Sequence, residues 1–460
     1  MIDRRLQKIN AIVLFLCLCY CLCLCANPQA GEDTDAAWKN RPEKVTVEGV
    51  DNHFSFIFHR DTSSDMTVIR LFINAGKKAE PENLGGLAFL TTRLSVEIPD
   101  QSTVRELMNL ASSFSPGVEG DHCIITIRCL SEKLEDTLKI LAGILKKPLF
   151  SGLRIDHIKK NMKFREKSEE DNGWTLMRRE YFTLFFGNTS NGGYGGSIYG
   201  DDGSRKKIRR KHVTGFFKKY FNLSNIVFSV SSNLDKAEIT ELMKRFSQSL
   251  PPGEPVEGHS LPPVKPVTVG GASKPAKKDH FIKKEKTQAL VCLGALLPGT
   301  TPVNFTRAYM LEVLLGEGIG SRLWPLRAVE NLAYRMQAKV IHMKDAGLLT
   351  VCLETDKTKK EKAFKALKEM MNDLYQKGVT EAELASAKVR AWSYFLRNNE
   401  TRENRSYTLG YFEAVGLGFE FPGEFFSHIK KVTREDFNAY IKRVLRPDDL
   451  VKVVIGPEEN

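Results

Sequence analysis

The sequence Leu314-Leu315-Gly316-Glu317-Gly318-Ile319-Gly320-Ser321-Arg322-Leu323 separates two different patterns. Residues 306–315 have apolar side chains at helical spacing, which predicts a helix that runs into the glycines. Residues 333–342 and 347–355, on the far side, have the pattern of strands. The three glycines interrupt the helical pattern, so they predict a turn between the helix and a sheet. A short glycine loop alone is a weak signal for phosphate binding, and no nucleotide-binding motif accompanies it.

Strand and helix patterns follow a similar order on both sides of residues 251–278. Residues 155–185 predict one long charged helix, and residues 187–203 predict a loop rich in Gly and Asn. The segment 251–278 is rich in Pro, Gly and Lys, which is typical of a linker. The chain is therefore predicted to hold two units that each mix sheet and helix, at residues 45–250 and 279–460.

The N-terminus has the pattern of an export signal. Arg4, Arg5 and Lys8 precede an apolar run at residues 11–25, and residues 26–30 offer small side chains for cleavage. We therefore expect residues 1–30 to be a signal peptide, residues 31–44 a flexible leader, and the protein to be periplasmic or extracellular. The apolar run is short for a membrane span, which needs about 20 residues. An uncleaved anchor and a lipid anchor both stay open, although Leu24 stands before Cys25 where a lipid acceptor site has a small residue.

Five of the nine cysteines lie inside this apolar run. The other four lie in strand-like apolar runs and do not have the spacing of metal ligands: Cys123, Cys129, Cys292 and Cys352. We interpret these four as small core residues rather than as a disulfide framework.

The composition indicates a globular protein. The chain has 460 residues, 42% hydrophobic and 27% charged, with a net charge of +12. Basic and acidic residues are mixed along most of it. The densest basic run, residues 205–211, contains no aromatic residue and lies near no nucleic-acid-binding motif, so we interpret it as a solvated helix face. No nucleic-acid partner is expected.

Short motifs on both sides of the glycine turn give a more specific indication. Leu326-Arg327 and Leu332-Ala333-Tyr334 follow the turn at close spacing. Further motifs of the same set lie at residues 74–76, 86–88, 148–150, 194–200, 378–384 and 387–388. In order and spacing, this set resembles the pitrilysin/insulinase family of metallopeptidases, which includes the mitochondrial processing peptidases, over residues 45–458. The resemblance implies an α+β fold with two similar domains, each a mostly antiparallel sheet covered by helices. It also implies that Gly316, Gly318 and Gly320 form a turn beside the substrate chamber.

The chain departs from this family at the zinc site. The family motif His-x-x-Glu-His should directly follow Gly86-Leu87-Ala88, but Phe89, Thr92 and Arg93 stand at its three functional positions. The third ligand, a later glutamate, would align near Arg165 or Glu166. Among the nine histidines of the chain, no two have the helical spacing of ligands. The sequence therefore predicts no metal in this chain and excludes an autonomous zinc peptidase.

One catalytic element of the family is kept. The resemblance implies that one half of a two-part enzyme supplies an Arg and a Tyr seven residues apart, and Arg327 and Tyr334 have this spacing. Such side chains donate to the oxyanion that develops during attack on a peptide carbonyl. The alternative is that Arg327 forms an ion pair on a helix and Tyr334 packs on a strand.

Two hypotheses follow. In the first, the chain is a non-catalytic subunit of a secreted zinc metallopeptidase. It pairs with a zinc-bearing homologue and contributes Arg327 and Tyr334 to peptide binding and transition-state stabilisation. The zinc then lies in the partner, and a membrane contact arises only through a retained or lipidated signal. In the second, the chain is a non-proteolytic binding or scaffold protein of the same fold.

Overall fold

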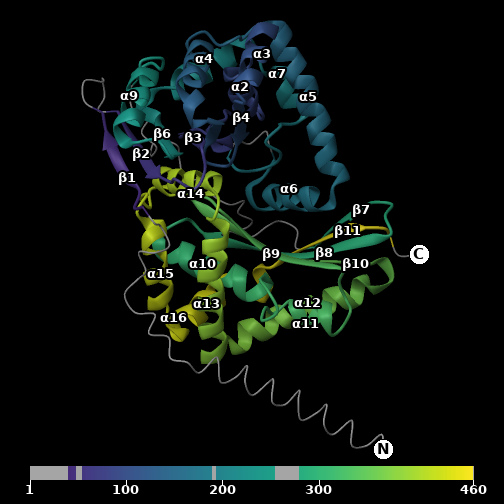
Figure 1. The fold of residues 1–460 in the computed structure, drawn as a ribbon. Coiled ribbons are helices and arrows are strands. Elements are labelled where there is room, and N and C mark those ends of the chain that lie inside the picture. Colours follow the sequence, from purple (N-terminus) through teal and green to yellow (C-terminus); the bar gives the residue numbers. More distant parts are fainter. Residues whose placement is uncertain (1–39, 48–53, 189–192, 254–278, 459–460) are drawn as a thin grey trace, which may run out of the picture. The chain divides into compact units, whose positions relative to one another are not determined.

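Two β-sheets organise the computed structural model, which describes residues 40–47, 54–188, 193–253 and 279–458 (Figure 1). The first sheet has the order β1-β2-β6-β3-β5-β4. Its strands are β1 (Glu43–Thr46), β2 (Ser55–Arg60), β3 (Met66–Ile73), β4 (Ser113–Val118), β5 (Cys123–Leu130) and β6 (Ile226–Ser232). All of its pairs are antiparallel except β2 with β6.

The second sheet has the order β7-β11-β8-β10-β9. Its strands are β7 (Asp279–Lys283), β8 (Gln288–Pro298), β9 (Arg335–His342), β10 (Ala346–Asp356) and β11 (Val451–Gly456). Only the pair β11 with β7 is parallel. The predicted α+β fold with two similar, mostly antiparallel sheets is therefore confirmed.

The first sheet places its two faces in different cores. On β3, Ile69, Leu71 and Ile73 point into the core formed with the helices of the first half, whereas Phe72 contacts the core of the second half. This alternation is the period of two that a strand imposes. The helices on the first side are α2 (Leu87–Ser95), α3 (Gln101–Asn109), α4 (Leu134–Lys146), α5 (Gly152–Asp171), α7 (Asp202–Lys207), α8 (Arg210–Tyr220) and α9 (Lys236–Ser247).

The second sheet is built in a similar way. On β8, Leu293, Ala295 and Leu297 join the core formed with the helices of the second half, whereas Leu290 and Cys292 face the opposite side. The helices on the first of these sides are α10 (Pro302–Gly316), α11 (Trp324–Ala328), α12 (Lys360–Lys377), α13 (Glu381–Asn398), α15 (Phe421–Lys431) and α16 (Arg434–Val444).

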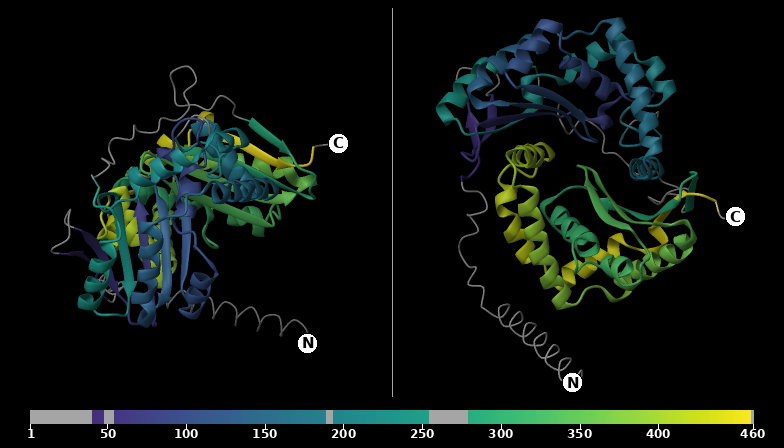
Figure 2. Two further views of the ribbon diagram at one scale, coloured as in Figure 1. Left: turned by 90° about the horizontal axis from the view of Figure 1, so that it is seen from above. Right: turned by 45° about the vertical axis from the view of Figure 1, so that its right-hand side comes forward.

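Two further helices cover the remaining sheet faces, and each belongs to the opposite half of the chain. Helix α14 (Arg402–Val415) packs on β3 and β6 of the first sheet, and helix α6 (Gly173–Phe186) packs on β8 and β11 of the second (Figures 1 and 2). A glycine makes each approach possible. A Cβ at Gly410 of α14 would lie 2.3 Å from the Phe72 ring, and a Cβ at Gly294 of β8 would lie 2.3 Å from the Tyr181 ring of α6.

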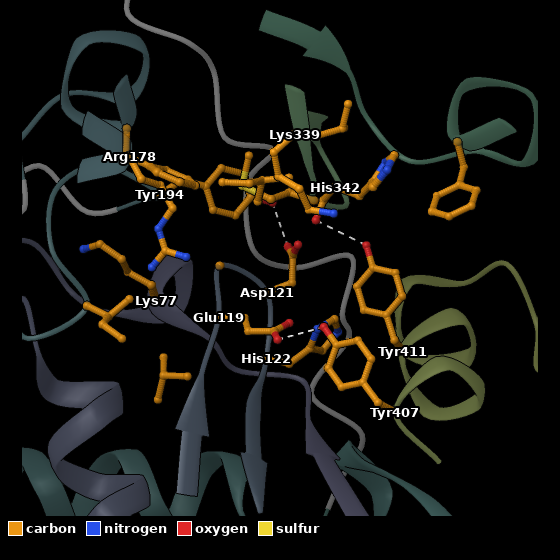
Figure 3. A pocket seen from close by; sticks show the side chains of 18 of the residues that line it. Lys77, Glu119, Asp121, His122, Arg178, Tyr194, Lys339, His342, Tyr407 and Tyr411 are labelled. Carbon is orange, nitrogen blue, oxygen red and sulfur yellow. Dashed lines mark hydrogen bonds between the residues drawn. The ribbon is translucent and has the colours of Figure 1, made fainter. Parts of the chain in front are cut away.

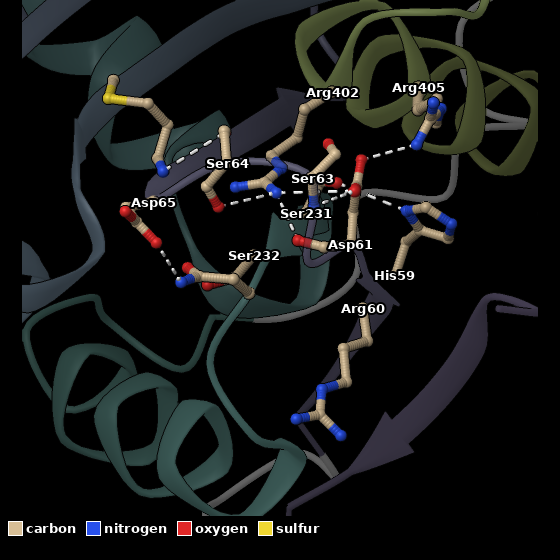
Figure 4. A network of polar contacts seen from close by, with 12 residues as sticks. His59, Arg60, Asp61, Ser63, Ser64, Asp65, Ser231, Ser232, Arg402 and Arg405 are labelled. Atoms are coloured by element: carbon tan, nitrogen blue, oxygen red, sulfur yellow. Dashed lines mark hydrogen bonds and ion pairs between the residues drawn. The ribbon is translucent and has the colours of Figure 1, made fainter. Parts of the chain in front are cut away.

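A polar network fixes the start of α14 to the loop after β2 (Figure 4). Asp61 is buried and lies 2.5 Å from Arg405 and 3.5 Å from Arg402. Arg402 also donates to the backbone carbonyls of Asp61 and Ser64. Burial by itself would raise the pKa of Asp61, but hydrogen bonds from Ser63 and the two arginine charges outweigh it and lower the pKa to about 2.

Three local features differ from the sequence-based predictions. The single helix predicted over residues 155–185 is wrong, because Asn172 ends α5 and accepts hydrogen bonds from the backbone of Trp174 and Thr175 at the start of α6. Strand β4 was not predicted. The interpretation of the four cysteines is wrong for one pair: Cys292 and Cys352 lie opposite each other on β8 and β10, 4.2 Å apart at Cα, and form a disulfide.

Cys123 and Cys129 are free and buried, which agrees with their interpretation as core residues. Residues 1–39, which contain the predicted signal and most of the leader, lie outside the described residues, as does nearly all of the predicted linker 251–278. The predicted domain boundaries therefore stay predictions. Residues 40–460 form one compact unit. None of the helices in the described part of the chain combines the length and the apolar character needed to cross a membrane.

Candidate functional site

The helix that should carry the zinc motif is α2, and a buried carboxylate fixes its start. Glu80 Oε1 accepts hydrogen bonds from the backbone N–H groups of Gly86 (3.0 Å) and Ala88 (2.9 Å). Gly86 has a φ of 90°, a left-handed conformation that favours glycine. Lys77 Nζ lies 3.7 Å from Glu80 Oε2. Burial raises the pKa of Glu80 and lowers the pKa of Lys77.

The three substituted motif positions make contacts within the chain. The Phe89 ring packs edge-to-face on Tyr199 with a centroid separation of 4.8 Å. Thr92 Oγ1 donates to the carbonyl of Ala88, one turn earlier, at 2.8 Å. Arg93 lies 2.5 Å from Glu97, four residues later on the same face. None of these side chains is a zinc ligand or a carboxylate base.

Glu166 on α5, at the expected position of the third ligand, pairs with a buried cation. Arg205 Nη2 lies 2.6 Å from Glu166 Oε2, and Arg205 also donates to the carbonyls of Tyr199 and Gly200. Arg205 is only 4% exposed, so the solvated face predicted for residues 205–211 does not include it. No group of three or more His, Cys, Asp and Glu side chains that could hold a metal ion occurs among the described residues. The residues present at the zinc positions do not fit zinc.

The glycine turn of residues 316–320 joins α10 to the second sheet and to α13. A Cβ at Gly316 would lie 2.7 Å from the backbone nitrogen of Ala338 on β9, and Gly318 has a φ of 75°. Gly320 lies against Arg390, which donates to the carbonyls of Val313 and Glu317 at 3.2 and 2.7 Å. The turn is therefore fixed by contacts with β9 and with α13. A position beside a substrate chamber stays a prediction for the three glycines.

Arg327 and Tyr334 are both exposed, and Tyr334 is 61% exposed. Arg327 lies at the end of α11 with its guanidinium 5.8 Å from the centre of the Trp324 ring. The backbone N–H of Tyr334 donates to the carbonyl of Glu354 on β10. Within the described part of the chain, neither side chain forms a hydrogen bond or an ion pair. Both are therefore available to a second molecule.

A cavity of about 480 Å³ lies between the two halves (Figure 3). Its walls come from the β4–β5 turn, α6, the loop around Tyr194, β9, and the helices α10, α13 and α14. Tyr194 donates to Asp121 Oδ1 at 2.7 Å, and Asp121 Oδ2 accepts from the backbone N–H of Lys344 at 2.8 Å. Sequence reasoning missed this site, because residues more than 200 positions apart form it and no motif connects them.

Two family models match the chain. The one described as Insulinase (Peptidase family M16) matches residues 56–182, and the one described as Peptidase M16 inactive domain matches residues 207–390. Together they cover more than half of the chain. The first match includes Phe89, Thr92 and Arg93.

Relatives that match over most of the chain differ in their names. An "Uncharacterized zinc protease" of Rickettsia felis is 23% identical over 91% of this chain and 98% of its own length. The "Non-peptidase homolog YmxG" of Helicobacter pylori is 23% identical over 87% of this chain and 91% of its own length. "Cytochrome b-c1 complex subunit 2, mitochondrial" of Schizosaccharomyces pombe is 23% identical over 73% of this chain and 77% of its own length.

Solved structures show the same fold. The peptidase M16 inactive domain from Pseudomonas fluorescens superposes with a TM-score of 0.78 at 21% identity, covering 91% of this chain and 98% of that one. A putative M16-like peptidase from Alicyclobacillus acidocaldarius gives a TM-score of 0.77 at 13% identity, with coverage of 91% and 99%. From the two family models, this fold and the substituted zinc motif, the chain belongs to the insulinase family, peptidase family M16, and fits an inactive homologue within it.

Proposed function

We propose that this chain is the non-catalytic subunit of an exported zinc metallopeptidase. In this proposal it pairs with a homologue that carries an intact His-x-x-Glu-His motif, and its Arg327 and Tyr334 complete the active site of that homologue. Peptides are the substrates of the pair.

One contrast between two sets of side chains supports this proposal. Phe89, Thr92 and Arg93 form contacts within their own half, so they are not available to a metal or to a substrate. Arg327 and Tyr334 are exposed and form no polar side-chain contact in the described residues. The positions that the family uses for zinc are thus occupied within the chain, whereas Arg327 and Tyr334 are accessible to a partner.

The chemistry of the pair suits an oxyanion. The partner's zinc, with its bound water and a glutamate base, would supply the nucleophile. The Tyr334 hydroxyl and the Arg327 guanidinium would donate to the carbonyl oxygen as negative charge develops on it. Removal of one such donor typically costs about 2.7–4 kcal/mol of transition-state stabilisation, which is a factor of about 100 or more.

Two features support export. Residues 1–30 have the pattern of a signal peptide. The disulfide between Cys292 and Cys352 is of the kind that persists in oxidising compartments and is rare in the reducing cytosol. The mature protein should begin near Asn27 or Gly31, which N-terminal sequencing of the native protein would test.

The decisive experiment is co-expression with a zinc-bearing homologue encoded by the same genome, followed by measurement of peptide turnover. Neither chain should cleave peptides alone, and the complex should hold one zinc, carried by the partner. Tyr334→Phe should lower kcat by about 100-fold without reducing complex formation. Tyr375→Phe on α12 is the matched control, because it makes the same chemical change at a half-buried ring elsewhere in the second half.

The alternative function gives a different result. If the complex forms but cleaves equally fast with wild type and with Tyr334→Phe, the chain is a binding or scaffold protein. Stoichiometric zinc in this chain alone would contradict both functions.

A further inference from the structure

The cavity between the two halves has the properties of a small-molecule site. Its volume of about 480 Å³ lies within the range of roughly 300–1,000 Å³ that is common for such sites. Neither Arg327 nor Tyr334 belongs to its lining. A ligand here would therefore contact a different part of the chain from a peptide held at the proposed active site.

Seven aromatic rings form much of the cavity lining and are called the aromatic wall here. These rings come from one helix of the first half and three helices of the second: Phe182, Phe305, Tyr309, Phe395, Tyr407, Tyr411 and Phe412. Several contact one another: Tyr407 stacks on Tyr411, and Phe305 packs edge-to-face on Phe412. Such a wall accepts an apolar or aromatic group.

The cavity also contains buried polar atoms that lack a hydrogen-bond partner in the described residues. These are His122 Nδ1 and His342 Nε2, together with Lys77 Nζ, whose ion-pair partner Glu80 lies 3.7 Å away, beyond hydrogen-bond distance. Lys77 and His122 are each only 2% exposed. A buried polar group without a partner costs about 1–3 kcal/mol, so a molecule that supplies partners to these atoms would gain affinity.

The lining holds three acidic side chains and four basic ones. Each acidic side chain already accepts a hydrogen bond from a hydroxyl group: Glu119 from Tyr407 at 2.8 Å, Asp121 from Tyr194 at 2.7 Å and Glu169 from Ser197 at 2.7 Å. Three of the basic side chains have acidic partners, in the pairs Lys77–Glu80, Arg179–Glu170 and Lys339–Glu312.

Arg178 is the exception among the basic side chains of the lining. It is exposed and forms no hydrogen bond or ion pair within the described residues, although its charge opposes the burial that raises the pKa of Glu119 and Glu169. In Figure 3 its guanidinium lies on the same side of the cavity as Lys77, away from the rings of Tyr407 and Tyr411. A planar guanidinium binds a carboxylate through two parallel hydrogen bonds.

We propose that this cavity binds a small carboxylate with an apolar body. Its anionic group pairs with Arg178, with Lys77 and the imidazoles of His122 and His342 as further polar contacts. The apolar body lies against the aromatic wall. The same chemistry is present in a free aromatic acid and in the C-terminal residue of a peptide.

The test measures binding to the full mature chain without any partner subunit, so its outcome does not depend on peptidase activity. The probes are N-acetylphenylalanine and its uncharged analogue N-acetylphenylalaninamide. Calorimetry or saturation-transfer NMR measures their binding. The acid should bind saturably, and the amide should bind at least tenfold more weakly, since it cannot form the charged pair.

Two variants on the same helix assign the anion site. Arg178→Gln should weaken binding of the acid about tenfold or more and should leave the amide unchanged. Arg179→Gln is the matched control, because its guanidinium already pairs with Glu170, and the affinity for the acid should stay within about threefold. Because Arg178 is exposed and has no polar contacts, its replacement should not alter folding, which an unchanged Tm would show.

The two sources of the carboxylate are separated by comparing 3-phenylpropionate with N-acetyl-Ala-Ala-Phe. Tighter binding of the tripeptide assigns the site to a peptide C-terminus, and binding of 3-phenylpropionate alone assigns it to a free acid. The proposal is overturned if no probe binds saturably up to about 10 mM, which corresponds to a binding free energy of about −2.7 kcal/mol. It is also overturned if acid and amide bind equally, or if Arg178→Gln has no effect. Equal binding of acid and amide would show that the cavity selects an apolar group and not an anion.

Discussion

Helices α6 and α14 have equivalent places in the two halves but are held by different chemistry. Each covers the sheet of the opposite half. Helix α14 begins in a network of charges around Asp61, and its Glu403 pairs with Arg70 and Arg128 of the first sheet. Helix α6 instead buries Tyr181, Phe185 and Phe186 in an apolar core.

One architecture can therefore be stabilised by either kind of interface. Apolar burial depends little on pH and salt, whereas buried ion pairs depend on the charge state of each member. We therefore expect the α14 interface to respond to charge substitutions and to acid, and the α6 interface to respond to changes of shape.

The largest effect is expected at Asp61. Asp61→Asn leaves the charges of Arg402 and Arg405 near a neutral group, and breaking a buried ion pair in this way costs about 3 kcal/mol. Denaturant unfolding should show this decrease in the free energy of unfolding. Asp235→Asn, at an exposed pair with Arg60, is the control and should change it by less than about 1 kcal/mol. Equal effects of the two changes would show that the α14 network does not carry the interface.

The two glycine contacts should come next, and they compare the interfaces directly. Gly410→Ala and Gly294→Ala each insert a Cβ 2.3 Å from an aromatic ring, so each should destabilise the chain by about 2 kcal/mol. Gly423→Ala on α15 has open space around its Cβ and should be neutral or stabilise the chain by up to about 1 kcal/mol. Thermal unfolding measures all three. If only one of the two buried glycines is sensitive, the two helices do not pack with equal closeness.

Acid should weaken the α14 side through His59. Burial, then the charge of Arg405, lowers the pKa of His59 from 6.5 to about 4. Between these values the unfolded chain binds a proton that the folded chain does not, so stability falls as the pH decreases from about 6.5 to about 4. One proton corresponds to about 1.4 kcal/mol per pH unit. His59→Asn should reduce this slope in unfolding experiments, and an unchanged slope would exclude His59 as its source.

The smallest effect is expected on the α6 side. Tyr181→Phe removes the hydroxyl that donates to the carbonyl of Val451 at 3.0 Å but keeps the ring. The loss should be about 1 kcal/mol, the usual net value of one hydrogen bond, and should be the same at pH 7 and pH 5. A strong dependence of this loss on pH would contradict the division between a charged and an apolar interface.

The family and the fold could be predicted because they depend on short local motifs. The turn at Gly316, the pattern around Gly86 and the spacing from Arg327 to Tyr334 are all visible within a few residues. The substituted zinc positions could be read in the same way. The contacts made by the residues at these positions could not be predicted. Tyr199 contacts Phe89 and Arg205 contacts Glu166, and each pair is more than 35 residues apart in sequence.

The features that the sequence did not predict were missed for specific physical reasons. Pro116 and Gly117 argue against a strand at residues 113–118, but β4 is an edge strand, where proline is tolerated. The disulfide depends on the register that places Cys292 opposite Cys352, and register is not readable from either strand alone. The helix break at Asn172 has a local signal, since Asn followed by Gly is a common turn dipeptide.

The packing of α6 and α14 on the sheets of the opposite halves also has a consequence for synthesis. All strands of the first sheet have been synthesised once β6 ends at Ser232. The helix that covers the face carrying Phe72 begins only at Arg402. At roughly 5–20 residues per second, the intervening stretch of about 170 residues takes on the order of 10–30 seconds to emerge from a ribosome. During that time an apolar sheet face has no covering helix. The nascent chain is therefore a natural client for a holding chaperone until α14 has been synthesised.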